Sequence, residues 1–341
     1  MSSRDSSAPD GSGLPAHGGD IAAAEERFGR PADGWLDLST ALNPFSYPLG
    51  EIPPEAWRRL PDRAEMTALC EAAASYYRAP DPAMLVAAPG TQALIQILPR
   101  LVEPCTVTVI GPTYGEHARC WRAAGHRVTV CDAAQAADGH VVVVVNPNNP
   151  DGRRLEPDGL VALAEALARR GGLLVVDEAF ADVAPEVSVA GRVGPGMVVL
   201  RSFGKFFGLA GLRLGFAIAP PPLALALRDM MGPWAVAGPA IAIGTRALAD
   251  RKWMAVTRNR LAREALALDG LLGAAGMTVL GGTPLFRLVS AGRAWALYEY
   301  LGERGILVRP FPLSPRWLRF GLPPGAEGRD RLKRALDDWR E

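Results

Sequence analysis

Five consecutive valines, Val141–Val145, limit the fold of this chain more than any other feature of its sequence. A strand with one solvated face alternates apolar and polar side chains, whereas an unbroken apolar run is typical of a strand buried on both faces. Further apolar runs lie at residues 106–110, 172–176 and 196–200, and segments with helical periodicity alternate with these runs. This order predicts an α/β fold in which helices cover a mixed, mostly parallel sheet.

The pattern changes after about residue 250. A long helical segment at 251–276 leads into shorter strand-like and helical segments, and the chain ends in a charged helix. This part predicts a smaller α+β domain of ordinary size. We therefore divide the chain into a flexible N-terminus with an arm (1–45), a large domain (46–250) and a small C-terminal domain (251–341).

Charge and composition argue against several classes of protein. The net charge of +1 gives no general attraction to nucleic acid or to an acidic membrane surface. The N-terminus lacks the apolar segment of a secretory signal, and the longest apolar run is too short to span a bilayer. We therefore expect a cytoplasmic protein with free thiols. Metal binding is not expected, because the cysteines and histidines lack the spacing of zinc sites: Cys70, Cys105, Cys120, Cys131, His17, His117, His126 and His140.

Conspicuous polar residues follow several of the predicted strands. The segment NPNNPDG (146–152) follows the valine run, Asp177 ends the next strand, and Ser202 and Lys205 follow the one after it. Ligands of α/β sheets bind outside the carboxyl ends of the strands, so these residues are candidates for a shared site. Taken singly, each has a structural explanation: a turn, a helix cap or a solvated lysine. Their joint occurrence in this order favours a site.

In this order the motifs resemble those of the fold-type I pyridoxal-phosphate enzymes, the class I and II aminotransferase superfamily. The resemblance implies pyridoxal 5'-phosphate as the cofactor. It also implies a homodimer whose subunit boundary lies near residues 43–60, and an N-terminal arm close to the active site. The matching segments cover nearly the whole chain: PGTQ (89–92), GPTYGE (111–116), NPNNPDG (146–152), DEAF (177–180), SFGKFFGLAGLRLGF (202–216) and LRFGLP (318–323).

The resemblance gives the catalytic roles to Lys205 and Asp177. A lysine that binds the cofactor covalently must be neutral, so Lys205 needs a lowered pKa. A carboxylate beside the pyridine nitrogen keeps that nitrogen protonated, which is the role of Asp177. The resemblance also places Asn149 at the ring's phenolic oxygen and Tyr114 on the ring face. It assigns the cofactor phosphate to Gly90, Thr91, Gln92, Ser202 and Arg213.

Three positions depart from the common pattern of that superfamily. Phe180 stands where many relatives have a tyrosine that donates to the ring oxygen. Leu60, in RLPD, replaces the tyrosine of an RYPD segment that reaches the partner subunit's cofactor phosphate. Gly204 replaces a hydroxyl residue just before the lysine. We expect fewer polar contacts to the cofactor as a result, with binding retained.

Two arginines are the candidate substrate ligands. Arg319 resembles the superfamily arginine that holds the substrate α-carboxylate, since a guanidinium binds a carboxylate through two parallel hydrogen bonds. Arg309 lies one strand earlier and suggests a second anion on the substrate. In histidinol-phosphate aminotransferases the matching arginine meets a phosphate. A phosphorylated amino acid is therefore the expected substrate.

The N-terminal segment resembles that of the threonine-phosphate decarboxylases of cobalamin biosynthesis. HGGD begins at His17, and Asn43-Pro44 follows a short predicted strand. The resemblance places His17, Gly18, Gly19 and Asn43 near the substrate, and DEAF with Phe180 is also found in that group. It implies decarboxylation of L-threonine O-3-phosphate to (R)-1-amino-2-propanol O-2-phosphate. Two alternatives stay open: an aminotransferase of a phosphorylated substrate, and a non-enzymatic pyridoxal-phosphate-binding regulator.

Overall fold

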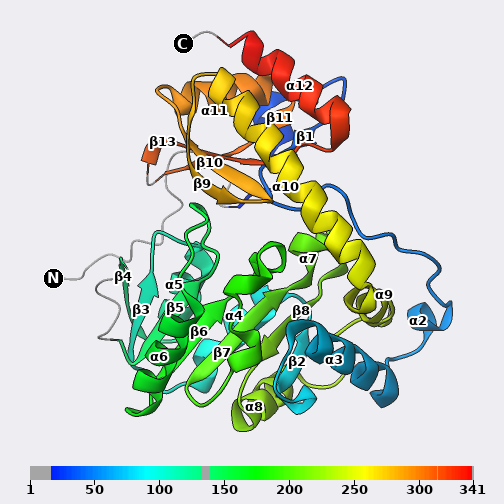
Figure 1. The fold of residues 1–341 in the computed structure, drawn as a ribbon, viewed down its shortest axis with the longest axis vertical. Helices are drawn as coiled ribbons and strands as arrows, with labels where there is room; N and C mark the ends of the chain where they lie inside the picture. The colour runs from blue at the N-terminus through cyan, green and yellow to red at the C-terminus, as the bar shows by residue number, and fades with distance from the viewer. Residues whose placement is uncertain (1–16, 133–138, 313, 340–341) are drawn as a thin grey trace.

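The computed structural model describes residues 17–132, 139–312 and 314–339. Its centre is a seven-stranded sheet in the order β2-β8-β7-β6-β5-β3-β4 (Figure 1). β8 runs antiparallel to both of its neighbours, while the other pairings are parallel, so the predicted mixed, mostly parallel sheet is confirmed. The strands are β2 (Leu85–Ala88), β3 (Thr106–Ile110), β4 (Arg127–Cys131), β5 (Val141–Val145), β6 (Leu173–Asp177), β7 (Met197–Ser202) and β8 (Gly215–Ile218).

The valine run forms β5, an interior strand of this sheet between β6 and β3, and all five side chains are buried. Alternate valines enter different hydrophobic clusters: Val142 and Val144 pack in one, and Val141 and Val143 in the other. Successive side chains of a strand point to opposite faces, which is why both faces need a cover. Helices supply it: α3 (Arg63–Tyr77), α4 (Thr91–Ile97), α5 (Gly115–Ala123), α6 (Pro157–Ala168), α8 (Pro221–Met231) and α9 (Gly238–Ala249).

The C-terminal part is built around a four-stranded antiparallel sheet in the order β12-β13-β10-β9. The long helix α10 (Arg251–Ala274) runs from beside α9 along this sheet (Figure 1). The two units match the α/β and α+β parts expected from the sequence, while the boundaries at residues 45 and 250 stay predictions. The remaining elements here are β9 (Thr278–Thr283), β10 (Phe286–Ser290), α11 (Ala294–Glu303), β11 (Ile306–Leu307), β12 (Arg309–Phe311), β13 (Ser314–Gly321) and α12 (Gly325–Asp337).

The N-terminal arm pairs with the C-terminal part. β1 (Leu36–Asp37) lies parallel to β11, with Leu36 opposite Ile306. The arm also carries the short helix α1 (Ile21–Phe28), and the short helix α2 (Glu55–Arg58) follows the arm within the large domain. The arm and α2 thus connect the C-terminal part to the large domain (Figure 1). None of the helices in the described ranges is both long enough and apolar enough to cross a membrane.

Candidate active site

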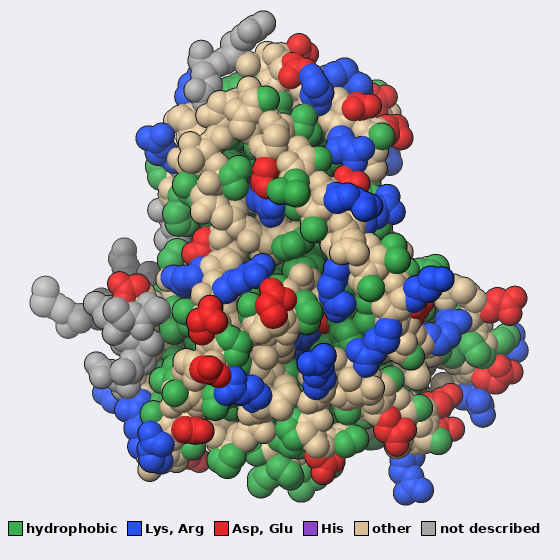
Figure 2. Space-filling view, in the orientation of Figure 1, with side chains coloured by type: hydrophobic (Ala, Val, Ile, Leu, Met, Phe, Trp, Pro, Cys, Tyr) green, Lys and Arg blue, Asp and Glu red, His purple; other side chains and the backbone are tan. Residues whose placement is uncertain are grey.

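A cavity of about 690 Å³ lies where the carboxyl ends of β5, β6 and β7 face β12 and β13. Lysine and arginine side chains gather around the junction of the two parts (Figure 2). The carboxyl ends of parallel strands share one edge, so residues distant in the sequence meet there. The cavity brings together thirteen of the fifteen predicted site residues: His17, Gly18, Gly90, Thr91, Gln92, Tyr114, Asn149, Asp177, Ser202, Lys205, Arg213, Arg309 and Arg319.

Lys205 lies in the one-turn helix α7 (Phe203–Phe206), directly after β7. Its amine reaches into the cavity, 3.4 Å from the carbonyl oxygen of Thr40. Burial, together with the positive charges of Arg319 and Arg213, lowers the pKa of Lys205 to about 8, although the charge of Asp177 opposes the shift. A lysine with this pKa has a sizeable neutral fraction near physiological pH, which a nucleophilic amine requires.

Asp177 ends β6 and is buried at the bottom of the cavity. Its Oδ2 lies 2.8 Å from Nε2 of His117, and its Oδ1 accepts a hydrogen bond of 3.0 Å from the Ala179 backbone N–H. No local pattern points to His117, because it lies 60 positions from Asp177 and is one of four scattered histidines. These two contacts hold the Asp177 carboxylate in a fixed position at the cavity floor.

The motif NPNNPDG serves both as a turn and as part of the site. Asn146 and Asn148 hold the loop: Asn146 Oδ1 accepts from the Leu155 N–H at 2.9 Å, and Asn148 Oδ1 accepts from the Thr113 hydroxyl at 2.6 Å. Asn149 instead lines the cavity. The structural and functional interpretations of this motif therefore apply to different asparagines.

Arg319 is buried in β13 and holds two acceptors. Nη1 donates to Asn149 Oδ1 at 2.5 Å, and Nη2 donates to the Ser39 carbonyl at 2.5 Å. Its Nε is buried and has no hydrogen-bond partner among the described residues. Burial, together with the charge of the neighbouring Arg309, lowers the pKa of Arg319 to about 9, although Asp37 opposes the shift. A buried cation with a donor to spare is a fitting partner for an anion.

A cradle suited to phosphate lies at the start of α4. Gly90 has a φ of +86°, and a Cβ at this position would lie 2.8 Å from Nη2 of Arg213. Glycine thus lets the guanidinium approach the backbone where α4 begins. Thr91, Gln92 and the Ser202 hydroxyl line the same cavity. These groups form the kind of donor set that binds a phosphate.

Gly19 and Asn43 are the two predicted site residues outside the cavity lining. The Gly19 N–H donates to the Ser39 hydroxyl at 2.8 Å. Asn43 Nδ2 donates to the Phe206 carbonyl at 2.7 Å, and its backbone N–H donates to the Lys205 carbonyl at 3.0 Å. In this structure Asn43 therefore holds the backbone of the lysine segment, a different set of contacts from the predicted contact with substrate.

The three departures have different surroundings. The Phe180 ring lies 5.7 Å from the Lys205 amine and packs edge-on against Phe286. Close packing explains the glycine at position 204, because a Cβ there would lie only 2.8 Å from the Cα of Ala210. Leu60 is 65% exposed and does not line the cavity.

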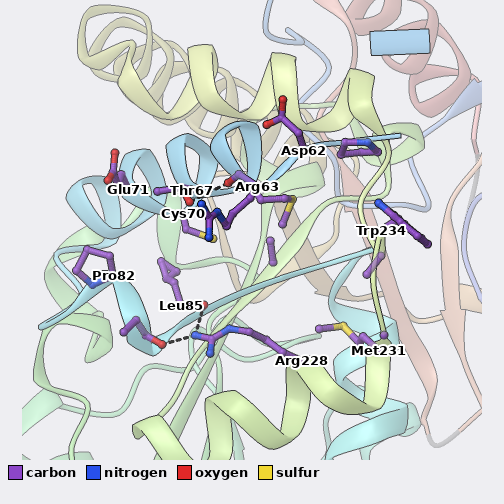
Figure 3. Close-up of a pocket in the computed structure, with 16 residues that line it drawn as sticks. Asp62, Arg63, Thr67, Cys70, Glu71, Pro82, Leu85, Arg228, Met231 and Trp234 are labelled. Carbon is purple, nitrogen blue, oxygen red and sulfur yellow. Dashed lines mark hydrogen bonds between the residues drawn. The ribbon is translucent and has the colours of Figure 1, made fainter. Parts of the chain in front are cut away.

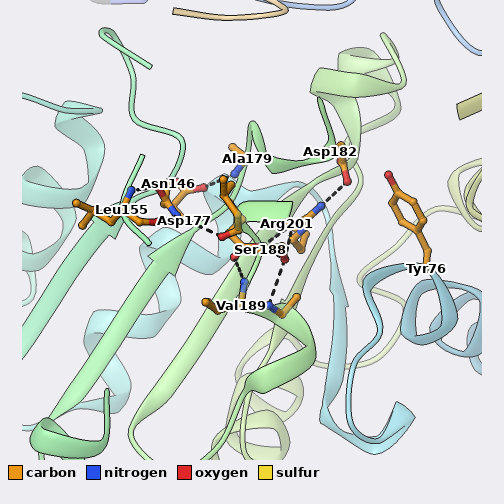
Figure 4. Close-up of polar contacts among 12 residues, drawn as sticks. Tyr76, Asn146, Leu155, Asp177, Ala179, Asp182, Ser188, Val189 and Arg201 are labelled. Carbon is orange, nitrogen blue, oxygen red and sulfur yellow. Dashed lines mark hydrogen bonds and ion pairs between the residues drawn. The ribbon is translucent and has the colours of Figure 1, made fainter. Parts of the chain in front are cut away.

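A buried charge cluster lies behind the site, on the opposite face of the strand ends. Arg201 precedes Ser202, and Glu178 follows Asp177, so both side chains point away from the cavity. Arg201 donates to Glu178 at 2.5 Å and also to Asp182 (Figure 4). Glu178 additionally accepts from the Ser188 hydroxyl at 2.5 Å. The cluster ties the strand that carries Asp177 to the strand that leads to Lys205.

Known proteins resemble this chain in sequence and in fold. The family model "Aminotransferase class I and II" matches residues 54–336. The chain is 49% identical to a threonine-phosphate decarboxylase of Sinorhizobium sp, covering 94% of this chain and 97% of that protein. It is 44% identical to one of Pseudomonas aeruginosa, covering 95% and 98%. The fold is similar to that of a Sinorhizobium meliloti histidinol-phosphate aminotransferase in complex with pyridoxal-5'-phosphate, with a TM-score of 0.81, 23% identity and coverage of 92% and 93%.

Proposed function

The chain belongs to the class I and II aminotransferase family, and from this premise we propose that it decarboxylates L-threonine O-3-phosphate with pyridoxal 5'-phosphate as cofactor. The product would be (R)-1-amino-2-propanol O-2-phosphate, which serves cobalamin biosynthesis. One observation of the site supports this substrate: Arg309 and Arg319 line the same cavity as Lys205, so two cations face the space where a substrate would lie. Threonine phosphate carries two anionic groups, a carboxylate and a phosphate.

The residues present fit the cofactor. Lys205 would hold it covalently, and Asp177, supported by His117, would face its ring nitrogen. Asn149 would meet the ring oxygen, and Tyr114 would stack on the ring. The phosphate would lie in the cradle of Gly90, Thr91, Gln92, Ser202 and Arg213. When bound, the cofactor supplies an electron-accepting ring for the charge left on the substrate Cα.

The side chains of this protein would orient the substrate and move a proton. Arg319 would bind the substrate carboxylate and hold its bond to Cα perpendicular to the ring. Arg309 would bind the phosphate, which anchors the far end of the substrate. Lys205 would act as the proton carrier: its free amine would first take up a proton from solvent, and the resulting ammonium would donate that proton to Cα after carbon dioxide leaves.

The runner-up is an aminotransferase of a phosphorylated substrate. A specific observation keeps it open: histidinol-phosphate aminotransferases also resemble this chain, one from Citrifermentans bemidjiense at 29% identity over 91% of the chain. A single assay separates the two functions. Purified protein is incubated with threonine phosphate, with and without 2-oxoglutarate. Release of carbon dioxide without the keto acid supports the decarboxylase, whereas amino transfer that requires the keto acid would replace it with the aminotransferase.

We further propose that the protein works as a homodimer in the cytoplasm. A second cavity of about 550 Å³ lies between α3 and the end of α8, and Trp234 stands at its edge (Figure 3). Trp57, Leu60 and Trp234 are 67%, 65% and 59% exposed, and Leu60 directly precedes the cavity residue Pro61. Exposed aromatic and aliphatic side chains around a hollow favour an interface with another protein surface. We assign this face to the second subunit.

A further inference from the structure

We infer that Glu116 is a positioning residue for the cofactor corner of the cavity: its carboxylate sets the orientation of the Gln92 amide and, through that amide, of the Tyr114 hydroxyl. Neither Glu116 nor its partner Arg119 was among the predicted site residues, although both line the cavity. The inference rests on the proposed binding of pyridoxal phosphate at this site. It concerns how the protein prepares that corner before the cofactor arrives.

The direction of the hydrogen bonds follows from the chemistry of a carboxylate. An ionised carboxylate only accepts hydrogen bonds, so the group of Gln92 that faces it must be the amide NH₂. Gln92 Nε2 lies 2.7 Å from Glu116 Oε2. The amide oxygen of Gln92 then faces Tyr114, whose hydroxyl lies 3.1 Å away and must donate. One charged group thus sets the polarity of the whole series of contacts.

Glu116 is itself held firmly. Arg119, one turn further along α5, donates to Oε1 from Nε at 2.8 Å and to Oε2 from Nη2 at 2.5 Å. Nε2 of His17 lies 3.6 Å from Oε1, which brings the N-terminal segment to the same carboxylate. The hydrogen bonds from Arg119 hold the pKa of Glu116 below its usual value, although burial opposes the shift. Glu116 is therefore charged at neutral pH.

The orientation of Gln92 matters because its two ends have opposite polarity. With the NH₂ group directed to Glu116, the amide keeps a second N–H that can serve an anion. Rotation by half a turn would instead present the amide oxygen, which repels a phosphate. An amide without a fixed partner samples both orientations. Glu116 therefore favours the orientation of Gln92 in which an N–H faces the phosphate. In this role Glu116 acts through Gln92 and does not itself contact the phosphate.

A purely structural role makes a different prediction. Glu116 lies in the first turn of α5, where a negative charge stabilises the helix, and its pair with Arg119 adds to this. If that were its whole role, substitution would lower the unfolding temperature and leave cofactor affinity unchanged. Affinity for the cofactor, measured on the apoprotein, is therefore the readout that separates the two roles.

The experiment is a double-mutant cycle on cofactor affinity. Apoprotein variants Glu116→Leu, Glu116→Gln, Gln92→Leu and the double variant Glu116→Leu/Gln92→Leu are titrated with pyridoxal phosphate by absorbance. We expect Glu116→Leu to weaken binding by about tenfold, and Glu116→Gln, which keeps an acceptor, by less than about threefold. The double variant should bind no more weakly than Gln92→Leu alone, because Glu116 acts through Gln92. Arg119→Met, measured alongside, controls for loss of the ion pair, and thermal unfolding confirms that each variant is folded.

The outcomes separate this inference from the proposed function. Effects of the two leucine substitutions that multiply in the double variant would overturn the inference, as would a Glu116→Leu protein with wild-type affinity. Glu116→Leu and Arg119→Met proteins that lose equal thermal stability but keep wild-type cofactor affinity would assign Glu116 a purely structural role and also overturn the inference. A wild-type protein that does not bind pyridoxal phosphate would refute the proposed function together with the inference.

Discussion

Arg309 of β12 and Arg319 of β13 occupy directly opposed positions on two antiparallel strands, so both side chains leave the sheet on the cavity side. Side chains that oppose each other in this way lie close together, and like charges there repel. Burial lowers the pKa of both guanidinium groups, and Arg309 lowers that of Arg319 further. An anionic substrate bound between the two guanidinium groups would relieve this repulsion. The pair is therefore suited to bind the two anionic groups of the proposed substrate.

Substitution of the two arginines should affect different steps: Arg309→Ala should change substrate preference, and Arg319→Ala should change turnover. Arg309→Ala should weaken threonine phosphate binding by about one to two powers of ten and narrow the preference for threonine phosphate over threonine. Arg319→Ala should harm both substrates alike and reduce turnover, because the carboxylate loses its fixed orientation. Steady-state kinetics of both variants on both substrates test this. A phosphate preference that survives Arg309→Ala would assign the phosphate to another group, with His17 as the next candidate.

Lys205 should react with the cofactor in a pH range set by its lowered pKa. The ammonium form cannot attack an aldehyde, so covalent capture by the apoprotein should rise about tenfold per pH unit below pH 8 and level off above it. Stopped-flow absorbance at a series of pH values measures this. Arg319→Ala should move the midpoint upward, since a cation that disfavours the ammonium is gone. A rate that keeps rising to pH 10 contradicts the prediction.

Substitution of Lys205 tests whether this residue is the one that binds the cofactor covalently. Lys205→Ala should keep the fold and lose the yellow absorption band that borohydride reduction abolishes, because the amine that forms the covalent link is absent. Mass spectrometry after reduction measures the attached cofactor. A reduced adduct on the Lys205→Ala protein would show that another amine is the attachment point.

The buried Arg201 cluster should contribute strongly to stability. Arg201→Met leaves Glu178 and Asp182 buried without their cation, which should cost about 3–5 kcal/mol of unfolding free energy. Arg192→Met is the matched control, because it breaks an exposed pair with Asp158 and should cost less than about 1 kcal/mol. Urea unfolding of both variants measures the difference. Equal costs would show that the buried cluster contributes no more than a surface pair.

The proposed homodimer predicts a position-dependent effect of charge. Trp234→Glu should raise the dimer dissociation constant by at least about tenfold, because it places a charge in an apolar interface. Leu266→Glu, at a similarly exposed position on α10, is the control and should leave assembly unchanged. Light scattering over a range of concentrations measures both. A wild-type protein that is monomeric and active at assay concentration would refute the dimer.

Local patterns are enough for the sheet and for much of the cavity lining. The valine run predicts β5 as an interior strand of a covered sheet, and the apolar runs that precede Asp177 and Lys205 predict their positions at strand ends. These predictions succeed because the spacing of apolar residues along the chain depends directly on which side chains are buried. In addition, the carboxyl ends of parallel strands lie at one edge of the sheet. The resemblance of the motifs then supplies the cofactor, which residue patterns alone do not identify.

Other features depend on contacts between distant segments. Three sets of contacts join residues that no local pattern relates: Asp177 with His117, Gln92 with both Glu116 and Tyr114, and Asn43 with the lysine segment. The sequence by itself determined which residues could carry charge and where the strands would end. Only the tertiary structure decided which of them face each other, because hydrogen bonds and ion pairs form over a few ångströms and depend on how helices pack on the sheet.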